Sequence, residues 1–245
     1  MGSTIKSKYK VFEDTSPYTK NSRYDNPKEI FKGILSELKK NVKKNDFFSA
    51  VDIGCANGEF LYFLKNNFPK AKLNGYDFTQ SFIDTGKSFK GLEGVNLKKK
   101  NLFDIKNEKF DITFCLGTFQ IFHEIEKPLS KLLDITRDGG LIFIESLFNK
   151  HDIDVRLEFS DNTIKEMKGV WRSDFNQHSY SGISKFLKKR VKSFKFDELP
   201  MNSEILYNKN TPSTFSFTFK DYKGKNIITN GLNLILNSTL LTIKK

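Results

Sequence analysis

Short apolar runs alternate with amphipathic segments between residues 47 and 148, and this alternation is the feature that most constrains the fold. Five runs have the length of buried strands: 47–54, 71–79, 95–103, 109–117 and 141–148. Helical spacing of apolar residues occurs between them, at 58–68, 80–91 and 126–140, the last ended by glycines. Strands that alternate with helices predict a parallel α/β sheet with helices on both faces.

The flanking segments add further elements. An amphipathic helix is expected at 27–41, after a capping signature made by Asn26, Pro27 and Glu29. Residues 149–180 are polar and irregular. The elements expected after them are a helix at 181–190, a strand at 191–199, a hairpin within 214–231 and a strand at 238–245.

These elements are expected to form one domain over residues 1–245. Its three parts are an N-terminal lid and helix at 1–46, a cofactor-binding core at 47–148, and a substrate-covering segment with the closing strands at 149–245. A chain of 245 residues is long enough to bury one substantial core.

The composition limits the partners and the compartment. The chain has 41 Lys and Arg against 29 Asp and Glu, which favours anionic partners, or else simply gives a lysine-rich solvated surface. Cys55 and Cys115 lack the spacing of a zinc site, so we expect no metal and a reduced, cytoplasmic protein. No secretory signal or membrane-spanning run is expected, since the apolar run at 141–148 is short and contains Glu145.

A glycine-containing loop, VDIGCANGEF, follows the first predicted strand. Gly54 and Gly58 are four residues apart, whereas a dinucleotide loop needs GxGxxG and a P-loop needs Lys-Ser/Thr after its last glycine. A helix N-terminus beside Asp52, without a grip for pyrophosphate, favours a cofactor whose near end is not an anionic phosphate. The alternative is that both glycines serve only close packing.

VDIGCANG resembles the first motif of the class I S-adenosylmethionine-dependent methyltransferases, (D/E)xGxGxG, with Ala56 at the middle glycine. FDITFCLGTFQIFHE and RDGGLIFIES resemble the fourth and fifth strands of the same family, so that the likeness covers about residues 47–148. It implies a Rossmann-like class I methyltransferase fold with a mostly parallel seven-stranded sheet, helices on both faces and a C-terminal hairpin insertion. It also implies S-adenosyl-L-methionine as cofactor and S-adenosylhomocysteine as product.

The resemblance further implies which residues hold this cofactor. Asp77 ends the second strand, where the family has an acid that accepts hydrogen bonds from both ribose hydroxyls; the alternative is that it caps the following helix. Asn101 and Leu102 lie where the family holds the adenine edge, or Asn101 is an ordinary loop residue. The whole implied set is Asp52, Gly54, Cys55, Ala56, Gly58, Asp77, Phe78, Asn101, Leu102, Leu116 and Gly117.

Methyl transfer to a hydroxyl requires a base for the hydroxyl proton, and histidine is the usual one. The chain has three histidines. His123 follows the fourth predicted strand and ranks first, His178 second and His151 third, and Glu145 is a further polar candidate. Each histidine could instead be a solvated or capping residue.

The acceptor is predicted from what the chain lacks and from its tail. No NPPY-like tetrapeptide, Pro-Cys pair or closely spaced pair of glutamates occurs where other acceptor classes need them, which leaves small-molecule O- or N-methylation. The segments KHDIDVRLEFSDN and SGISKFLKK, with Trp171 between them, resemble methyltransferases of bacterial surface-polysaccharide (capsule or lipopolysaccharide) gene clusters. This likeness implies a sugar, a sugar-nucleotide or a phosphorylated precursor, held by Arg156, Arg172 and Trp171.

Two other functions remain open. An RNA methyltransferase could use basic residues to track a phosphate backbone, and the candidates are Lys98, Lys99, Lys100, Lys185, Lys188, Lys189 and Arg190. A non-catalytic cofactor-binding protein would keep the same fold without transfer.

Overall fold

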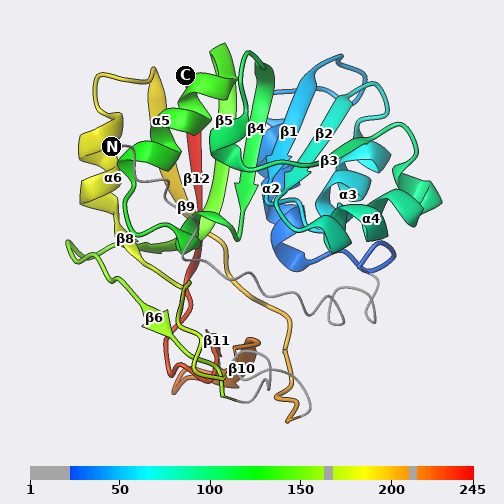
Figure 1. Ribbon diagram of the computed structural model, residues 1–245. Coiled ribbons are helices and arrows are strands. Elements are labelled where there is room, and N and C mark those ends of the chain that lie inside the picture. The colour runs from blue at the N-terminus through cyan, green and yellow to red at the C-terminus, as the bar shows by residue number, and fades with distance from the viewer. Residues whose placement is uncertain (1–22, 163–167, 210–213) are drawn as a thin grey trace.

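The computed structural model describes residues 23–162, 168–209 and 214–245, so the first 22 residues of the predicted N-terminal lid lie outside the described part. A seven-stranded sheet forms its centre (Figure 1). Its strands, in spatial order, are β3 (Asn96–Lys99), β2 (Lys72–Asp77), β1 (Ser49–Ile53), β4 (Phe110–Leu116), β5 (Thr136–Asn149), β12 (Ser238–Lys244) and β9 (Ser193–Glu198).

Neighbouring strands from β3 to β5 are parallel, whereas β12 runs antiparallel to both β5 and β9. The two-residue strand β8 (His178–Ser179) adds a parallel pairing at the end of β5. The prediction of a mostly parallel seven-stranded sheet is therefore confirmed, with its only reversed strand next to the edge among the described residues.

Helices cover both faces of the sheet, as predicted. On one face lie α2 (Glu29–Lys39), α3 (Glu59–Asn67) and α4 (Gln80–Ser88), and on the other lie α5 (Glu126–Ile135) and α6 (Tyr180–Leu187). Alternate strand residues feed the two cores because successive side chains of a strand point to opposite faces. In β5, Phe143 packs into the first core, and Ile142 and Ile144 pack into the second.

The predicted capping signature of α2 is wrong. The helix begins at Glu29 with Lys28 at its N-cap position, which makes no side-chain capping bond. The carboxylate of Glu29 accepts hydrogen bonds from the backbone N–H groups of Asn202 and Ser203 instead. These bonds, that of Ser203 above all, lower the pKa of Glu29 to about 2. A partner 173 residues away thus replaces the local capping box.

Two predicted boundaries also change. Helix α5, which was predicted to run to residue 140, ends at Ile135, and β5 begins at Thr136. The pairing of β4 with β5 then shifts register between Phe110 and Ile112. The Thr136 hydroxyl is buried and contacts that of Thr113 in β4 at 2.7 Å, so the sheet takes over from the helix here. The strand predicted at 95–103 shortens to β3, and Leu102 begins the short 3-10 helix η2 (Leu102–Asp104).

Strands β1, β2, β4 and β5 end at the same edge of the sheet, which we call the carboxyl edge. Two insertions extend from this edge. One joins β5 to α6 and contains β6 (Glu158–Phe159) and β7 (Arg172–Ser173), which lie in the segment predicted to be irregular. The other joins β9 to β12 and contains the predicted hairpin, formed by β10 (Phe217–Lys220) and β11 (Asn226–Thr229). Together they form what we call the carboxyl-edge lobe, at the lower end of Figure 1.

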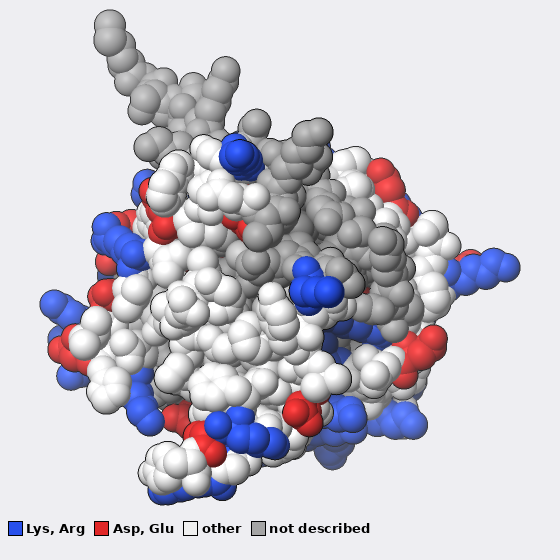
Figure 2. Space-filling view, turned by 90° about the horizontal axis from the view of Figure 1, so that it is seen from below, with Lys and Arg blue, Asp and Glu red and all other residues white. Residues whose placement is uncertain are grey.

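The carboxyl-edge lobe exposes several apolar side chains. Trp171 is 64% exposed and Tyr222 of the hairpin turn is 91% exposed. The described residues visible from this end are mostly uncharged, and many of the charged side chains lie toward the rim (Figure 2). Over the described residues, no helix is long and apolar enough to cross a membrane.

Candidate cofactor and acceptor site

The loop after β1 is shaped by two glycines in the left-handed region. Gly54 has φ of 75° and donates its N–H to the carbonyl of Tyr76 at 2.7 Å. A Cβ at this position would lie 2.0 Å from Oγ1 of Thr118, so no larger residue fits. Gly58 has φ of 86° and precedes α3 as its N-cap residue. Both glycines therefore bring backbone close to the loop after β4 and to the start of α3.

Asp77 ties the end of β2 to this glycine loop. Its Oδ2 accepts the N–H of Ala56 at 3.0 Å, and its Oδ1 accepts the N–H of Thr79 at 2.8 Å. Burial raises the pKa of Asp77, against these bonds, which favour the carboxylate. Each oxygen keeps a lone pair, so the carboxylate can accept two ribose hydroxyls as well. The bond to the N–H of Thr79, the N-cap residue of α4, fixes the chain just before that helix, and the ribose role of Asp77 stays a prediction.

Asp52 lies next to Asp77 at the middle of the site and is 3% exposed. Its Oδ1 is buried and has no hydrogen-bond partner among the described contacts. Burial, together with the charge of Asp77, raises the pKa of Asp52 to about 8, while Lys28 opposes the shift. A buried carboxylate oxygen without a donor is costly, so this position favours a ligand that brings a donor or a positive charge.

Two more buried carboxyls, Glu59 of α3 and Glu145 of β5, complete the acidic side of the site. Burial raises the pKa of both, and Lys28 acts in the opposite direction on each. Burial in turn lowers the pKa of Lys28 to about 8. The methionine end of S-adenosylmethionine carries a sulfonium and an ammonium, which suit the three carboxyls, and a carboxylate, which suits Lys28. The charged groups on this side of the site therefore fit this cofactor.

The remaining predicted cofactor residues lie around the same edge. The N–H of Gly117 donates to the Glu145 carbonyl, which keeps this residue paired with β5. Its φ of 65° then makes the chain turn directly after β4. Asn101 caps η2, with its side chain accepting the N–H of Phe103 at 3.0 Å. Leu102 is buried and Phe78 is 36% exposed. Their cofactor contacts stay predictions.

Cys55 differs from the other predicted cofactor residues. Its side chain is buried in the first core, and its Sγ would lie 2.9 Å from a Cβ built at Gly75. Burial raises the pKa of its thiol well above the ordinary range. The thiol therefore faces the core, and any contact with a cofactor would come from the backbone.

The three candidate histidines have different surroundings. His178 is 3% exposed, its Nε2 lies 2.9 Å from the Phe122 carbonyl, and burial lowers its pKa. His151 is exposed. His123 lies in the loop after β4, is 26% exposed at its side chain, and has Nε2 3.9 Å from Oε1 of Glu158. The contact of His178 with a carbonyl holds two segments of the structure together, whereas the side chains of His123 and His151 keep exposed surface; the role of His123 as a base stays a prediction.

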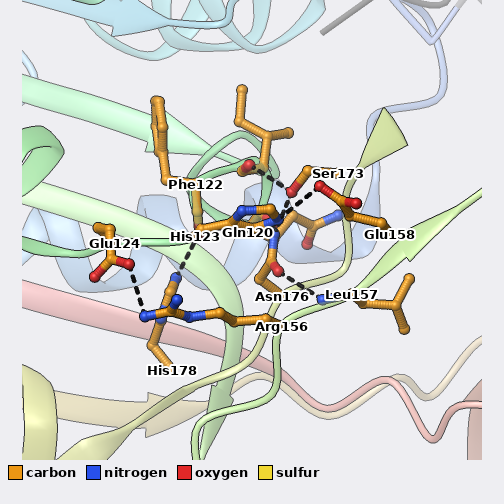
Figure 3. Close-up of polar contacts among 11 residues, drawn as sticks. Gln120, Phe122, His123, Glu124, Arg156, Leu157, Glu158, Ser173, Asn176 and His178 are labelled. Carbon is orange, nitrogen blue, oxygen red and sulfur yellow. Dashed lines mark hydrogen bonds and ion pairs between the residues drawn. The ribbon is translucent and has the colours of Figure 1, made fainter. Parts of the chain in front are cut away.

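A set of contacts clamps the loop after β4 to the carboxyl-edge lobe (Figure 3). Asn176 is fully buried, donates from Nδ2 to the Gln120 carbonyl at 2.7 Å, and accepts the N–H of Leu157 at 2.9 Å. Ser173 donates to the Ile121 carbonyl at 3.0 Å. These bonds hold His123 at the boundary between the cofactor side and the lobe.

The residues predicted to grip an acceptor have partners of their own. Arg156 pairs with Glu124 at 2.6 Å, and the guanidinium of Arg172 lies 4.6 Å from the centroid of the Phe159 ring. Trp171 is 64% exposed. Charge recognition by the two arginines would require these contacts to open.

Sequence reasoning missed four residues of this site: Lys28, Glu59, Glu158 and Asn176. Glu59 carries a usable signal, because a carboxyl next to the apolar run FLYFL and directly after the glycine loop must face something polar. Lys28, Glu158 and Asn176 lie in polar stretches and gain their roles only from contacts between distant segments.

The family comparison agrees with this geometry. A family model described as "Methyltransferase domain" matches residues 51–142, which include the end of β1, the glycine loop, Asp77 and strands β2 to β4. This match, together with the sheet order, makes the central part of the chain similar to the methyltransferase domains that the family model describes.

Curated relatives carry different acceptors in their names. Malonyl-[acyl-carrier protein] O-methyltransferase of Bacillus anthracis is 26% identical over 157 residues, covering 63% of this chain and 57% of that protein. A tRNA U34 carboxymethyltransferase of Campylobacter hominis is 33% identical over 116 residues, covering 43% of this chain and 38% of that protein. The chain thus spans less than two thirds of the length of either relative.

Solved structures share the fold. The YcgJ protein of Bacillus subtilis aligns with a TM-score of 0.58 at 15% identity, covering 87% of this chain and 99% of that one. The Haloferax volcanii methyltransferase in complex with the Trm112 activator aligns with a TM-score of 0.61 at 10% identity, covering 96% and 98%. At these identities the likeness establishes the Rossmann-like methyltransferase architecture.

Proposed function

We propose that this chain transfers a methyl group from S-adenosyl-L-methionine to a hydroxyl of a small-molecule acceptor and releases S-adenosylhomocysteine. The observation that carries the proposal is Asp77, buried at the end of β2 and bonded to the backbone of the glycine loop at Ala56. This arrangement leaves a carboxylate for the ribose directly beside the buried carboxyls that suit the cationic methionine end.

Methyl transfer from a sulfonium requires the protein mainly to position the acceptor in line with the methyl group. The donor is already activated and its leaving group is a neutral thioether, so in-line alignment supplies most of the rate. A hydroxyl acceptor must also lose a proton, and His123 is our candidate for the base, because it is partly exposed in the loop that follows β4.

For the acceptor we propose a sugar, a sugar-nucleotide or a phosphorylated precursor of a surface polysaccharide. The support is the net charge of +12, which attracts anionic small molecules, and the likeness of the tail segments to enzymes of such gene clusters. Trp171, exposed on the carboxyl-edge lobe, could stack on a ring.

RNA is the second candidate acceptor, favoured by the tRNA-modifying relatives. The two basic runs do not form one path, since β3 is an edge strand and α6 lies on the opposite side of the molecule (Figure 1). Lys100 is also paired with Glu108. A phosphate backbone would therefore meet these runs separately.

Two measurements test the proposal. Calorimetric titration with S-adenosylhomocysteine should show binding; no binding would remove the enzyme interpretation and leave an unrelated use of the fold. Transfer of radiolabelled methyl groups should then be measured with UDP-, GDP- and dTDP-hexoses, unmodified tRNA and malonyl-loaded carrier protein. Methylation of a hexose nucleotide alone supports the proposal, whereas methylation of tRNA or of the malonyl carboxylate, which needs no base, refutes the sugar acceptor.

A further inference from the structure

We propose that Glu158 is a positioning residue for His123, and that the two side chains act together as the base of the methyl transfer. The inference deepens the proposed function and rests on it. It assigns a role to β6, a two-residue strand whose position in the carboxyl-edge lobe is otherwise unexplained.

The ring nitrogen Nε2 of His123 lacks a hydrogen-bond partner among the described residues. This atom is inaccessible to solvent, while Oε1 of Glu158 lies 3.9 Å away. A buried ring nitrogen without a partner is unfavourable, so a small rotation that closes this gap is favoured. Catalytic hydrogen bonds are often long before substrate binds and shorten in the reactive complex.

The backbone beside Glu158 is fixed relative to the loop that carries His123. The N–H of Leu157 is held by Asn176, which also binds the Gln120 carbonyl (Figure 3). Within the β6–β7 ladder Glu158 lies opposite Ser173, whose hydroxyl binds the Ile121 carbonyl. Glu158 and His123 are therefore carried by two segments that the same contacts lock together.

The other carboxylate near His123, that of Glu124, already forms an ion pair. Glu124, next to His123 in sequence, pairs with Arg156 at 2.6 Å. In the part of the chain that the structure describes, the ion pair of Glu158 is with His123 and no other. The charged groups around the ring are thus Glu158 on β6 and the Glu124–Arg156 pair.

A proton on Nε2 points to Glu158, so the lone pair of Nδ1 takes the proton of the acceptor hydroxyl. The oxygen electron pair forms the new O–CH3 bond while the S–CH3 bond breaks, and that bonding pair stays on sulfur as the neutral thioether. The imidazolium, stabilised by the Glu158 carboxylate, then releases its proton to solvent.

A double-mutant cycle on the full chain tests the pairing, with the hexose nucleotide methylated most rapidly in the panel as the acceptor. Glu158→Ala should lower kcat roughly ten- to a hundredfold with little change in the KM for S-adenosylmethionine. In the His123→Asn background the same change should have no further effect. Glu158→Asp should restore part of the rate, and Glu124→Ala is the matched control. An equal loss from Glu158→Ala in both backgrounds would overturn the pairing.

A second measurement needs no acceptor. The chain has only three histidines, so long-range proton–nitrogen spectra of the complex with S-adenosylhomocysteine can follow each ring, with His123 assigned from His123→Asn. Because the hydrogen bond of a ring nitrogen sets the tautomer of a histidine, Glu158→Ala should lower the share of His123 rings that carry the proton on Nε2, and the tautomer of His151 should not change. A tautomer of His123 that does not change, or that changes equally in Glu124→Ala, refutes the pairing. If the wild type binds cofactor but methylates nothing, the proposed function fails while this measurement still decides the pairing.

Discussion

Replacing Asp77 with alanine tests the cofactor assignment most directly. The change removes a carboxylate that holds the N–H groups of Ala56 and Thr79 and that we expect to accept both ribose hydroxyls. Losing the ribose bonds should weaken binding of S-adenosylhomocysteine by about 1–3 kcal/mol, a factor of about 5–150 in Kd. The two backbone N–H groups, left without their acceptor, should also lower the free energy of unfolding by about 1–3 kcal/mol each.

Calorimetric titration can separate these two effects if an analogue of S-adenosylhomocysteine that lacks the 2′-hydroxyl is used alongside the parent compound. The ribose role predicts that Asp77→Ala costs less affinity for the analogue than for the parent. Asp77→Asn is the matched control, because it retains one oxygen acceptor for the loop. Equal losses for both compounds would mean that the carboxylate acts only on the loop. Unchanged affinity for both would mean that the ribose assignment is wrong.

The other predictions concern the acidic side, the glycine loop and the clamp. The raised pKa of Asp52 means that the folded protein holds a proton which the unfolded chain loses, so this carboxyl costs stability increasingly as pH rises from about 4 to 8. Asp52→Asn should therefore raise Tm more at pH 8 than at pH 5, and an equal effect at both would contradict the shift. Gly54→Ala should lower the free energy of unfolding by at least about 1–2 kcal/mol in urea titrations, because φ is 75° and the new Cβ meets Thr118. Thr118→Ala should recover part of that loss if the clash contributes. Asn176→Ala should lower the free energy of unfolding by about 1–3 kcal/mol while leaving the Kd for S-adenosylhomocysteine unchanged, and weaker cofactor binding would show that the clamp reaches further than we infer.

The cofactor half of the molecule was predictable because its signals are local. Short apolar runs and period-3.6 patterns predicted β1 to β5 and α3 to α4, and Gly54, Gly58 and Asp77 lie at or after strand ends that a parallel sheet brings to one edge. The boundary errors at Asn26 and at the end of α5 arose where tertiary contacts overrode local preference. Glu29 binds a segment 173 residues away, and Thr136 joins the sheet instead of the helix.

The acceptor half was decided by tertiary structure alone. His178 ranked second to His123 as a candidate base in sequence, and the structure buries it against the Phe122 carbonyl, 56 residues earlier in the chain. No local pattern reports that contact, because its free energy comes from packing two irregular segments whose polar groups satisfy one another. The sequence by itself determined the sheet, its glycine loop and the edge at which we propose that a cofactor binds. Only the folded chain decided which histidine stays accessible and which carboxylate lies beside it.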